Sequence, residues 1–560
     1  MSYDLALRGG TVLDGTGAPP FRADVGVRDG RIAEIAPTVR GAVELDASGA
    51  VVCPGFLDLH THYDPQVLWD PWLTPSSGQG VTSVVAGNCG LSLAPCPPAM
   101  RGSLVRILEH VEDMPTAVLD AGVDWSFTTY PDYLARVGRA VGINFGGYVG
   151  HNAVRMTVLG EDAHDRAATA DEIDRMRALV ADALRAGALG FSTDRSGFHI
   201  GDRGRPVPSM NATQAEVEAL MRVTAEVGRG ICHVAPGEDF AWLYDFQPAL
   251  GRPITWSALL TYPEGSPRAH WADKLAVHRA GREAGADVHP QVTCRPIEQR
   301  ISAADPSSFY SVPAWAELAP LAPAQRAERY RDAAWRDRAY RELDSRRWVN
   351  PRWADITVVE TARHTGLIGR GIAELAAEAR QSGRPEDAAR TPLDVLLDLS
   401  LADDLRTRFA VTFANDDEDA LRTLLAAEGC VLGLSDAGAH AGQICDAHMP
   451  VDFLANWVRD RELMAPEQGV HRLTGEPADL LGLADRGRVR VGAAADLLAL
   501  RWDDLRAPTP RRVTDLPSGG ERLVVDAPPG LEHVVVNGSV TRRDGVDVGG
   551  DLARLPGRLL

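Results

Sequence analysis

Lysine is almost absent from this 560-residue chain: Lys274 is its only lysine, and every other member of its 58 basic residues is arginine. Basic residues are also in deficit, because 77 acidic residues give a formal net charge of −19. Proteins that bind nucleic acid or anionic membranes usually present a basic face. The charge balance therefore argues against both kinds of partner.

Other features are missing as well. The seven cysteines form no CxxC pair and are odd in number, which is typical of a reducing compartment rather than of a disulfide framework. There is no apolar run of roughly 18 residues, as a membrane-spanning helix requires, and no basic segment followed by an apolar stretch near the N-terminus. We therefore expect a cytoplasmic protein. The absence of a GxSxG pattern argues against a serine-hydrolase elbow.

The two ends of the chain share a pattern of short strands and tight turns. Residues 4–8 and 24–27 alternate between apolar and polar positions and are separated by Gly-Gly and Asp-Gly turns. Residues 487–500 and 534–538 have a similar pattern. We expect residues 1–54 and 485–560 to meet and form one small β-sandwich domain.

Between these ends, short apolar strands alternate with amphipathic helices, which indicates an α/β fold with a parallel sheet. A helix over residues 171–185 is delimited by Thr169 as its N-cap and by Gly187 at its end. The pattern predicts a (β/α)8 TIM-like barrel over residues 55–484. The expected strands are 51–60, 81–86, 144–151, 190–192, 230–233, 253–256, 287–289 and 431–436.

The predicted barrel region is longer than the ~250 residues of a typical (β/α)8 barrel. A stretch rich in Arg, Glu, Ala and Trp at about 300–390 has helical spacing and accounts for part of the excess. Its charges indicate either solvated helix faces or, alternatively, a lid over the site.

The first barrel strand ends in His60 and His62. Residues i and i+2 of a strand point the same way, so both imidazoles can bind one metal ion. Asp436 ends the eighth strand, where a barrel places catalytic groups. Asp436 alone would be interpreted as an N-cap or turn residue. Because strands one and eight are neighbours in a closed barrel, the HxH pair and Asp436 together predict a metal site.

Together with several other motifs, these residues make the chain resemble the amidohydrolase superfamily, and within it the N-acyl-D-amino-acid deacylase (D-aminoacylase) group. The resemblance extends nearly from end to end. It is carried by RGGTVLDG at 8–15, GVTSVVAGNCG at 80–90, GH at 150–151, GALGFS at 187–192, LTGEPA at 473–478 and GRVRVGAAADL at 487–497. The resemblance implies a metal-bearing (β/α)8 barrel, a small β-sandwich built from both termini, and metal-dependent amide hydrolysis.

The resemblance also implies a ligand set. Many members bridge two metals with a carboxylated lysine, but Lys274 lies in a helical segment, so that bridge is not expected here. The cysteine of GNCG is a ligand in the group and matches Cys89, and a thiolate suits zinc; a buried apolar cysteine is the alternative. On strand six, Trp256-Ser257 stands where the group has a histidine-rich segment. We therefore expect one tightly bound zinc, held by some of His60, His62, Cys89, His233 and Asp436, and leave a second zinc open. A role in the core is the alternative for His233. His289 and His440 could supply missing ligands, with a structural role as the alternative for each.

For substrate binding, Arg295 follows the seventh strand, near the position of an arginine that holds the substrate carboxylate in the group. A bidentate guanidinium suits that task, and a surface ion pair is the alternative. His151 and His440 are further candidates for substrate contacts, and a structural role is the alternative for His151.

The expected reaction is hydrolysis of an N-acyl-D-amino acid or a related small amide, with zinc activating water and Asp436 as general base. The alternatives are cyclic amide or ureido hydrolysis, tailoring of a peptide-like metabolite, a metal-dependent decarboxylase, and an inactive barrel that only binds a ligand.

Overall fold

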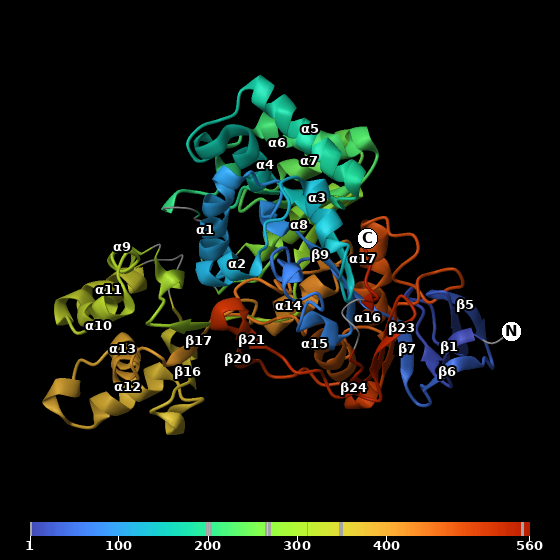
Figure 1. Ribbon diagram of the computed structural model, residues 1–560. Coiled ribbons are helices and arrows are strands. Elements are labelled where there is room, and N and C mark those ends of the chain that lie inside the picture. Colours follow the sequence, from blue (N-terminus) through green and yellow to red (C-terminus); the bar gives the residue numbers. More distant parts are fainter. Residues whose placement is uncertain are drawn as a thin grey trace. The chain divides into compact units, whose positions relative to one another are not determined.

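The computed structural model describes residues 3–197, 199, 201, 204–263, 266, 270–310, 312–345, 351–549 and 554–560 (Figure 1). The chain forms two compact units. Unit 1 comprises Met1–Leu259, Asp273–Cys294 and Arg422–Leu560, and unit 2 comprises Leu260–Ala272 and Arg295–Leu421. Among the described residues, no helix combines the length and apolar character needed to cross a membrane.

The centre of unit 1 is an eight-stranded parallel sheet whose strands follow one another in chain order. Thr61 and Ala437 form a parallel bridge, and the amide of His62 donates to the carbonyl of Ala437 at 2.8 Å, so the first and last strands meet and the barrel closes. This confirms the predicted (β/α)8 fold. The strands are β8 (Phe56–Asp58), β9 (Val81–Ala86), β10 (Asn144–Gly150), β11 (Gly190–Asp194), β12 (Ile231–Ala235), β13 (Ile254–Trp256), β14 (Val288–Val292) and β18 (Val431–Leu432).

Burial explains why these strands have the sequences they do. Every residue of β9, β10 and β11 is buried, because a parallel barrel strand is covered on both faces and reads as a continuous apolar or small-residue run. The helices that follow these strands include α1 (Arg101–Glu112), α2 (Thr116–Gly122), α3 (Tyr130–Val137), α4 (His151–Leu159), α5 (Ala170–Ala186), α6 (Gln214–Val227), α7 (Trp242–Leu250), α8 (Trp271–Glu283), α14 (Glu418–Leu425), α16 (Pro466–Leu473) and α17 (Gly475–Leu480). Helix α5 is the predicted helix, with Thr169 as its N-cap and Gly187 at its C-cap.

The expected single strand over residues 51–60 is two strands that serve different sheets. β7 (Val51–Pro54) belongs to a seven-stranded sheet formed by both ends of the chain, and β8 belongs to the barrel. Gly55 separates them, and a Cβ at this position would lie 2.1 Å from the hydroxyl oxygen of Thr82. The chain therefore passes from one sheet to the other at a residue without a side chain.

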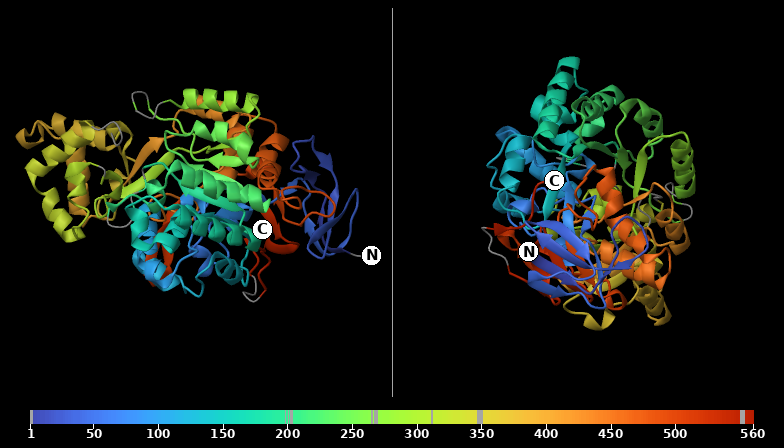
Figure 2. Two further views of the ribbon diagram at one scale, coloured as in Figure 1. Left: turned by 90° about the horizontal axis from the view of Figure 1, so that it is seen from above. Right: turned by 90° about the vertical axis from the view of Figure 1, so that its right-hand side faces the viewer.

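Both termini contribute to a β-sandwich, as predicted (Figure 2). One sheet has the order β5-β4-β1-β6 and comes from the N-terminus, and the other has the order β24-β23-β22-β19-β7-β2-β3 and mixes both ends. Leu7 and Val27 of the first sheet pack with Leu497 and Val535 of the second in one apolar core. The strands are β1 (Tyr3–Arg8), β2 (Thr11–Val12), β3 (Phe21–Arg22), β4 (Asp24–Arg28), β5 (Arg31–Ala36), β6 (Gly41–Asp46), β19 (Leu497–Leu500), β22 (Leu531–Val536), β23 (Ser539–Arg543) and β24 (Val546–Asp547). A separate hairpin pairs β20 (Arg511–Leu516) with β21 (Gly520–Val524).

Unit 2 contains the expected insertion but is larger than residues 300–390 and is not purely helical. β15 (Ile297–Ser302), β17 (Arg408–Ala414) and β16 (Thr357–Glu360) form an antiparallel sheet. Trp315, Trp335 and Phe409 are fully buried in a core that belongs to this unit. Its helices are α9 (Pro313–Ala316), α10 (Pro323–Tyr330), α11 (Ala333–Ser345), α12 (Ile372–Gln381) and α13 (Pro392–Ala402). The helical pattern in the sequence marked only the middle of the unit, because the outer strands that complete its sheet lie beyond that pattern.

Candidate metal centre

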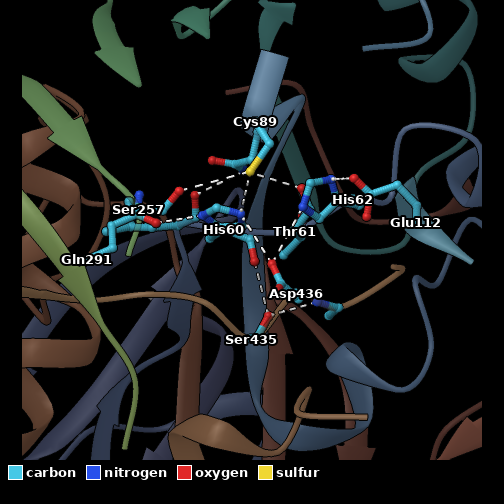
Figure 3. A network of polar contacts seen from close by, with 12 residues as sticks. His60, Thr61, His62, Cys89, Glu112, Ser257, Gln291, Ser435 and Asp436 are labelled. Carbon is cyan, nitrogen blue, oxygen red and sulfur yellow. Dashed lines mark hydrogen bonds and ion pairs between the residues drawn. The ribbon is translucent and has the colours of Figure 1, made fainter. Parts of the chain in front are cut away.

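Three buried side chains of unit 1 converge at the end of the barrel strands. His60 and His62 follow β8, and Cys89 follows β9 in the 3-10 turn Asn88–Gly90. One ligand atom from each lies within 4.8 Å of the others, and the Cys89 Sγ is 3.5 Å from the Nε2 of His60 (Figure 3). This group is where the spacing of the HxH pair predicted a metal.

The turn that carries Cys89 is fixed from several sides. Cys89 has a φ of +53°, a left-handed conformation that is costly for a non-glycine residue unless its surroundings hold it. Ser192 of β11 accepts a hydrogen bond from the amide of Gly90 at 3.1 Å and donates one to the carbonyl of Gly87. The Asn88 side chain donates to the carbonyls of Thr61 and Val85 at 3.2 and 3.0 Å. The Gly-Asn-Cys-Gly motif is therefore hydrogen-bonded to β9, to β11 and to the segment that follows β8.

Asp436 completes the group. It follows β18, the last barrel strand, at the point where the barrel closes. Its Oδ1 lies 3.2 Å from the Nε2 of His60 and 3.5 Å from the Nε2 of His62. Burial favours the neutral acid, but the hydrogen bond from His62 and the electrostatic influence of the neighbouring histidines outweigh it and lower the pKa of Asp436. The side chain remains 29% exposed, so an ionised carboxylate at this position is open to a substrate or to water.

Two polar residues outside the predicted set orient the histidine rings. The Oε1 of Gln291 on β14 lies 2.6 Å from the Nδ1 of His60, and the Oε1 of Glu112 at the end of α1 lies 3.2 Å from the Nδ1 of His62. Ligating histidines commonly use their second nitrogen in this way, which directs the Nε2 lone pair at the metal. No local sequence signal marks either residue, because Glu112 lies in a helix and Gln291 lies two residues beyond the expected seventh strand 287–289.

The chemistry of the donor set fits a zinc ion. Two imidazole nitrogens, one thiol and one carboxylate oxygen are ligands that zinc accepts in a tetrahedral arrangement. Burial lowers the pKa of His60 to about 4, so this imidazole is neutral and can offer a lone pair. Burial also raises the pKa of the Cys89 thiol to about 11, partly opposed by His62, so a bound cation is what would favour the thiolate.

His233 lies beside this group. It is fully buried on β12, and its ring centroid is 5.1 Å from that of His60 in an edge-on arrangement. Its Nε2 is 3.3 Å from the hydroxyl of Ser257, the residue that follows β13. His440 follows Asp436 in the chain, its charge contributes to the low pKa of Asp436, and its amide donates to the carbonyl of Glu112.

His151 belongs to a different buried network. Its Nδ1 is 2.8 Å from the hydroxyl of Thr193, its Nε2 is 3.0 Å from the Oε1 of Glu216, and Arg155 pairs with the same carboxylate. The ring is fully buried and both of its nitrogens are engaged. Helix α4 begins at His151 and directs the ring toward β11 and α6, so the expectation that this residue contacts substrate gains no support from the geometry.

The remaining candidates are placed elsewhere. His289 lies near the start of β14, where its ring contacts the carbonyl of Gly429 and the carboxylate of Asp287. Arg295 is the first residue of the larger segment of unit 2, and its carbonyl accepts a hydrogen bond from Asn415. Its role in substrate binding stays a prediction. Lys274 in α8 forms an ion pair with Glu238.

Comparison with known proteins identifies the family of the chain. The family model described as "Amidohydrolase family" matches residues 43–542. An N-acyl-D-glutamate deacylase from Alcaligenes xylosoxydans xylosoxydans is 30% identical and the match covers 89% of this chain and 88% of that protein. An N-acyl-D-aspartate deacylase from the same organism is 26% identical, with 88% and 85% covered.

Solved structures show the same fold. A D-aminoacylase structure from work on its binuclear metal centre superposes with a TM-score of 0.67 at 27% identity, covering 100% of this chain and 99% of that one. The N-acyl-D-glutamate deacylase from Bordetella bronchiseptica, complexed with zinc and a phosphonate inhibitor, gives a TM-score of 0.65 at 27% identity and full coverage of both chains. The chain therefore belongs to the amidohydrolase family, whose members act on C–N bonds, and it is similar to the D-aminoacylases.

Proposed function

We propose that this protein is a zinc-dependent amide hydrolase that deacylates N-acyl-D-amino acids or related small amides bearing a carboxylate. The observation that carries the proposal is the position of Asp436, whose Oδ1 faces the Nε2 atoms of both histidines of the HxH pair. Two relatives that match along most of the chain are deacylases of N-acyl-D-glutamate and N-acyl-D-aspartate, and they support the substrate class.

Some of His60, His62, Cys89, His233 and Asp436 would hold the metal ion. When bound, zinc supplies a Lewis acid for the amide carbonyl and acidifies water enough for attack near neutral pH. The expectation of one tight zinc remains part of the proposal, although the related D-aminoacylase has a binuclear centre.

Asp436 would act as the proton carrier of the reaction. Its lowered pKa keeps it ionised at neutral pH, so it can accept a proton from the attacking water. It would then return that proton to the amine nitrogen as the C–N bond breaks. Arg295 and His440 are proposed to contact the substrate, with Arg295 holding the carboxylate.

A substrate panel tests the proposal. N-acyl derivatives of D-glutamate, D-aspartate and D-leucine should be hydrolysed, while the matching L-isomers and a cyclic imide should react much more slowly. Asp436→Asn should lower kcat at least about 10³-fold, since both the base and the later acid are lost. Preferential cleavage of the cyclic imide would instead favour ring hydrolysis, and full activity of the Asn variant would disprove the role of Asp436.

A further inference from the structure

A histidine–aspartate pair that the proposed mechanism does not use lies at the end of β11. Asp194 is the last residue of this strand and is fully buried. Its Oδ2 lies 2.6 Å from the Nδ1 of His199, and its Oδ1 accepts a hydrogen bond from the amide of Ser196 at 2.7 Å. The side chain of His199 is 28% exposed, whereas that of Asp194 is inaccessible. A buried carboxylate therefore holds a ring that is partly open to solvent.

The geometry of β11 places Asp194 on the side of the strand that faces the metal centre. Side chains two residues apart on a strand share a face, and Ser192 of β11 contacts the turn that carries Cys89. The backbone of Asp194 also packs on this turn, because a Cβ added at Gly90 would lie 3.1 Å from the amide nitrogen of Asp194. Functional residues of (β/α)8 barrels lie at this end of the strands.

The described part of the loop after β11 reaches helix α1. A Cβ added at Gly201 would lie 3.1 Å from the Cγ1 of Ile107 on this helix. Helix α1 ends at Glu112, whose carboxylate contacts His62. Glu112 and His62 are close enough to His199 to act on it electrostatically. The loop thus spans two elements that flank the metal centre, and it carries His199 beside that centre.

The pair favours a positively charged ring at His199. Burial favours the neutral ring and His62 has the same effect, but Asp194 and Glu112 outweigh them and raise the pKa of His199 above its usual value. An ionised carboxylate can only accept, so the Nδ1 of His199 donates to Asp194. Among the described residues, only the Nδ1 of this ring has a hydrogen-bond partner. The Nε2–H of the charged ring is therefore available to a ligand.

We infer that His199 binds a carboxylate group of the substrate through its Nε2–H, and that Asp194 positions the ring for this contact. A hydrogen bond between an imidazolium and a carboxylate is charge-assisted, which makes it stronger than a neutral one. The inference rests on the proposed amide hydrolysis and adds a specificity-determining residue to that site. His199 takes no part in bond making, so the proton transfer stays with Asp436.

Two carboxylates fit this chemistry. One is the α-carboxylate that all N-acyl amino acids carry, and the other is the side-chain carboxylate of an N-acyl-D-glutamate or N-acyl-D-aspartate. The proposed role of Arg295 is compatible with the inference, because a dicarboxylic substrate offers a separate partner to each residue.

Calorimetric binding of three phosphonates tests the inference without turnover. They mimic the tetrahedral intermediates of N-acetyl-D-glutamate, of N-acetyl-D-norvaline, which lacks the side-chain carboxylate, and of N-acetyl-4-aminobutyrate, which lacks the α-carboxylate. His199→Asn should weaken binding of the D-glutamate mimic by about 10- to 100-fold, since a hydrogen bond to a charged group is lost.

The other two mimics identify the carboxylate. No effect of His199→Asn on the D-norvaline mimic would assign His199 to the side-chain carboxylate, and no effect on the 4-aminobutyrate mimic would assign it to the α-carboxylate. In each case the remaining mimic should show the full loss. Equal weakening of all three mimics, or of none, would overturn the inference.

Two controls separate recognition from damage to the loop or to the metal centre. Arg205→Gln removes a positive charge from the same loop, at a side chain that pairs with Glu161, and should bind all three mimics like the unaltered protein. Bound zinc, counted by elemental analysis, should be equal in His199→Asn and in the unaltered protein. The inference would be wrong if His199→Asn lost its zinc or if Arg205→Gln weakened binding as much as His199→Asn.

Asp194→Asn tests the positioning role through pH. Asparagine keeps the shape of aspartate without its charge, so the pKa of His199 should fall. Affinity for the D-glutamate mimic should decrease as the pH rises through the pKa of His199, because the neutral ring loses its Nε2 proton. In Asp194→Asn this decrease should begin at a lower pH, and in His199→Asn it should be missing. A decrease at the same pH in Asp194→Asn and in the unaltered protein would contradict the role of Asp194.

The outcomes also distinguish this inference from the proposed function. If the unaltered protein hydrolyses nothing on the substrate panel, the proposed function fails, while calorimetry still decides whether His199 binds a carboxylate. If the unaltered protein binds none of the three mimics, both are overturned.

Discussion

The carboxylate of Glu112 lies 3.2 Å from the Nδ1 of His62, and both side chains are buried. Glu112 is the last residue of helix α1, so a helix outside the barrel sheet orients a candidate metal ligand that follows a barrel strand. Burial alone would lower the pKa of His62, but the charge of Glu112 and the hydrogen bonds to Asp436 and Cys89 raise it well above its usual range. Without a metal, positive charge is favoured at the position that a cation would occupy.

Glu112→Gln is expected to weaken zinc binding. Loss of a partner that orients a ligating histidine typically costs about 10- to 100-fold in metal affinity. Competition with a chromophoric chelator measures the change. Glu109→Gln is the matched control, because Glu109 lies on the same helix but accepts a hydrogen bond from the amide of Thr116. Equal effects in both variants would mean that helix α1 acts only through stability.

Ser192→Ala is expected to weaken metal binding by the Cys89 thiol indirectly, through the backbone of the turn that carries Cys89. Ser192 bridges the Gly87 carbonyl and the Gly90 amide, and this contact helps to hold Cys89 in its left-handed conformation. In the cobalt-substituted protein, the sulfur-to-metal absorption should vanish in Cys89→Ala and weaken in Ser192→Ala. Ser83→Ala, at a buried strand serine that accepts from Asn144, should leave it unchanged. An unaltered spectrum in Ser192→Ala would contradict the bracing role.

Removing the metal should lower activity and stability together. Ligand binding to the folded state adds about 2.7 kcal/mol of stability at a free concentration 100 times the Kd. Dialysis against a chelator is therefore expected to abolish hydrolysis and to lower the unfolding temperature, and added zinc should restore both. His199→Asn, which leaves the candidate ligands intact, should show the same thermal shift on chelation. Retention of full activity after zinc has been removed to background would exclude a metal-dependent reaction.

The sequence allowed the barrel and the grouping of the HxH pair with Asp436 to be predicted, because both follow from strand patterns. The alternation in the HxH pair places two rings on one side of a strand, and a closed barrel brings Asp436 to them. Glu112 and Gln291 carry no such signal, since their role depends on where a helix and a distant strand come to lie. For His151, a local pattern was not enough to predict the surroundings of the ring. Its place after a strand suggested a site residue, but helix α4 begins there and directs the ring toward Glu216.

Chain connectivity limits the prediction in a second way. The run over residues 51–60 has the apolar character of one strand, and only the close approach of Thr82 to Gly55 shows where the chain changes sheets. In unit 2 the helices were recognised from their composition. The pairing of β15 with β17 joins segments more than a hundred residues apart, and the extent of the unit follows from that pairing.

The N-terminus of helix α5 should make the stability of the protein depend on pH. Thr169 and Glu172 form a capping box, and the hydrogen bonds from Arg166 and then from the Thr169 amide lower the pKa of Glu172 from 4.5 to about 2. Because the folded pKa lies below the unfolded one, the stabilisation is complete above about pH 4.5 and is lost as the pH falls toward 2. Glu172→Gln should therefore lower the free energy of unfolding at pH 7, with the difference from the unaltered protein shrinking between pH 5 and pH 2. Thr169→Ala should cost about 1 kcal/mol. Asp182→Asn is the control, because Asp182 forms an exposed ion pair on the same helix; its free energy of unfolding, measured by urea titration, should change little across this pH range. An effect of Glu172→Gln that does not depend on pH would contradict the assignment.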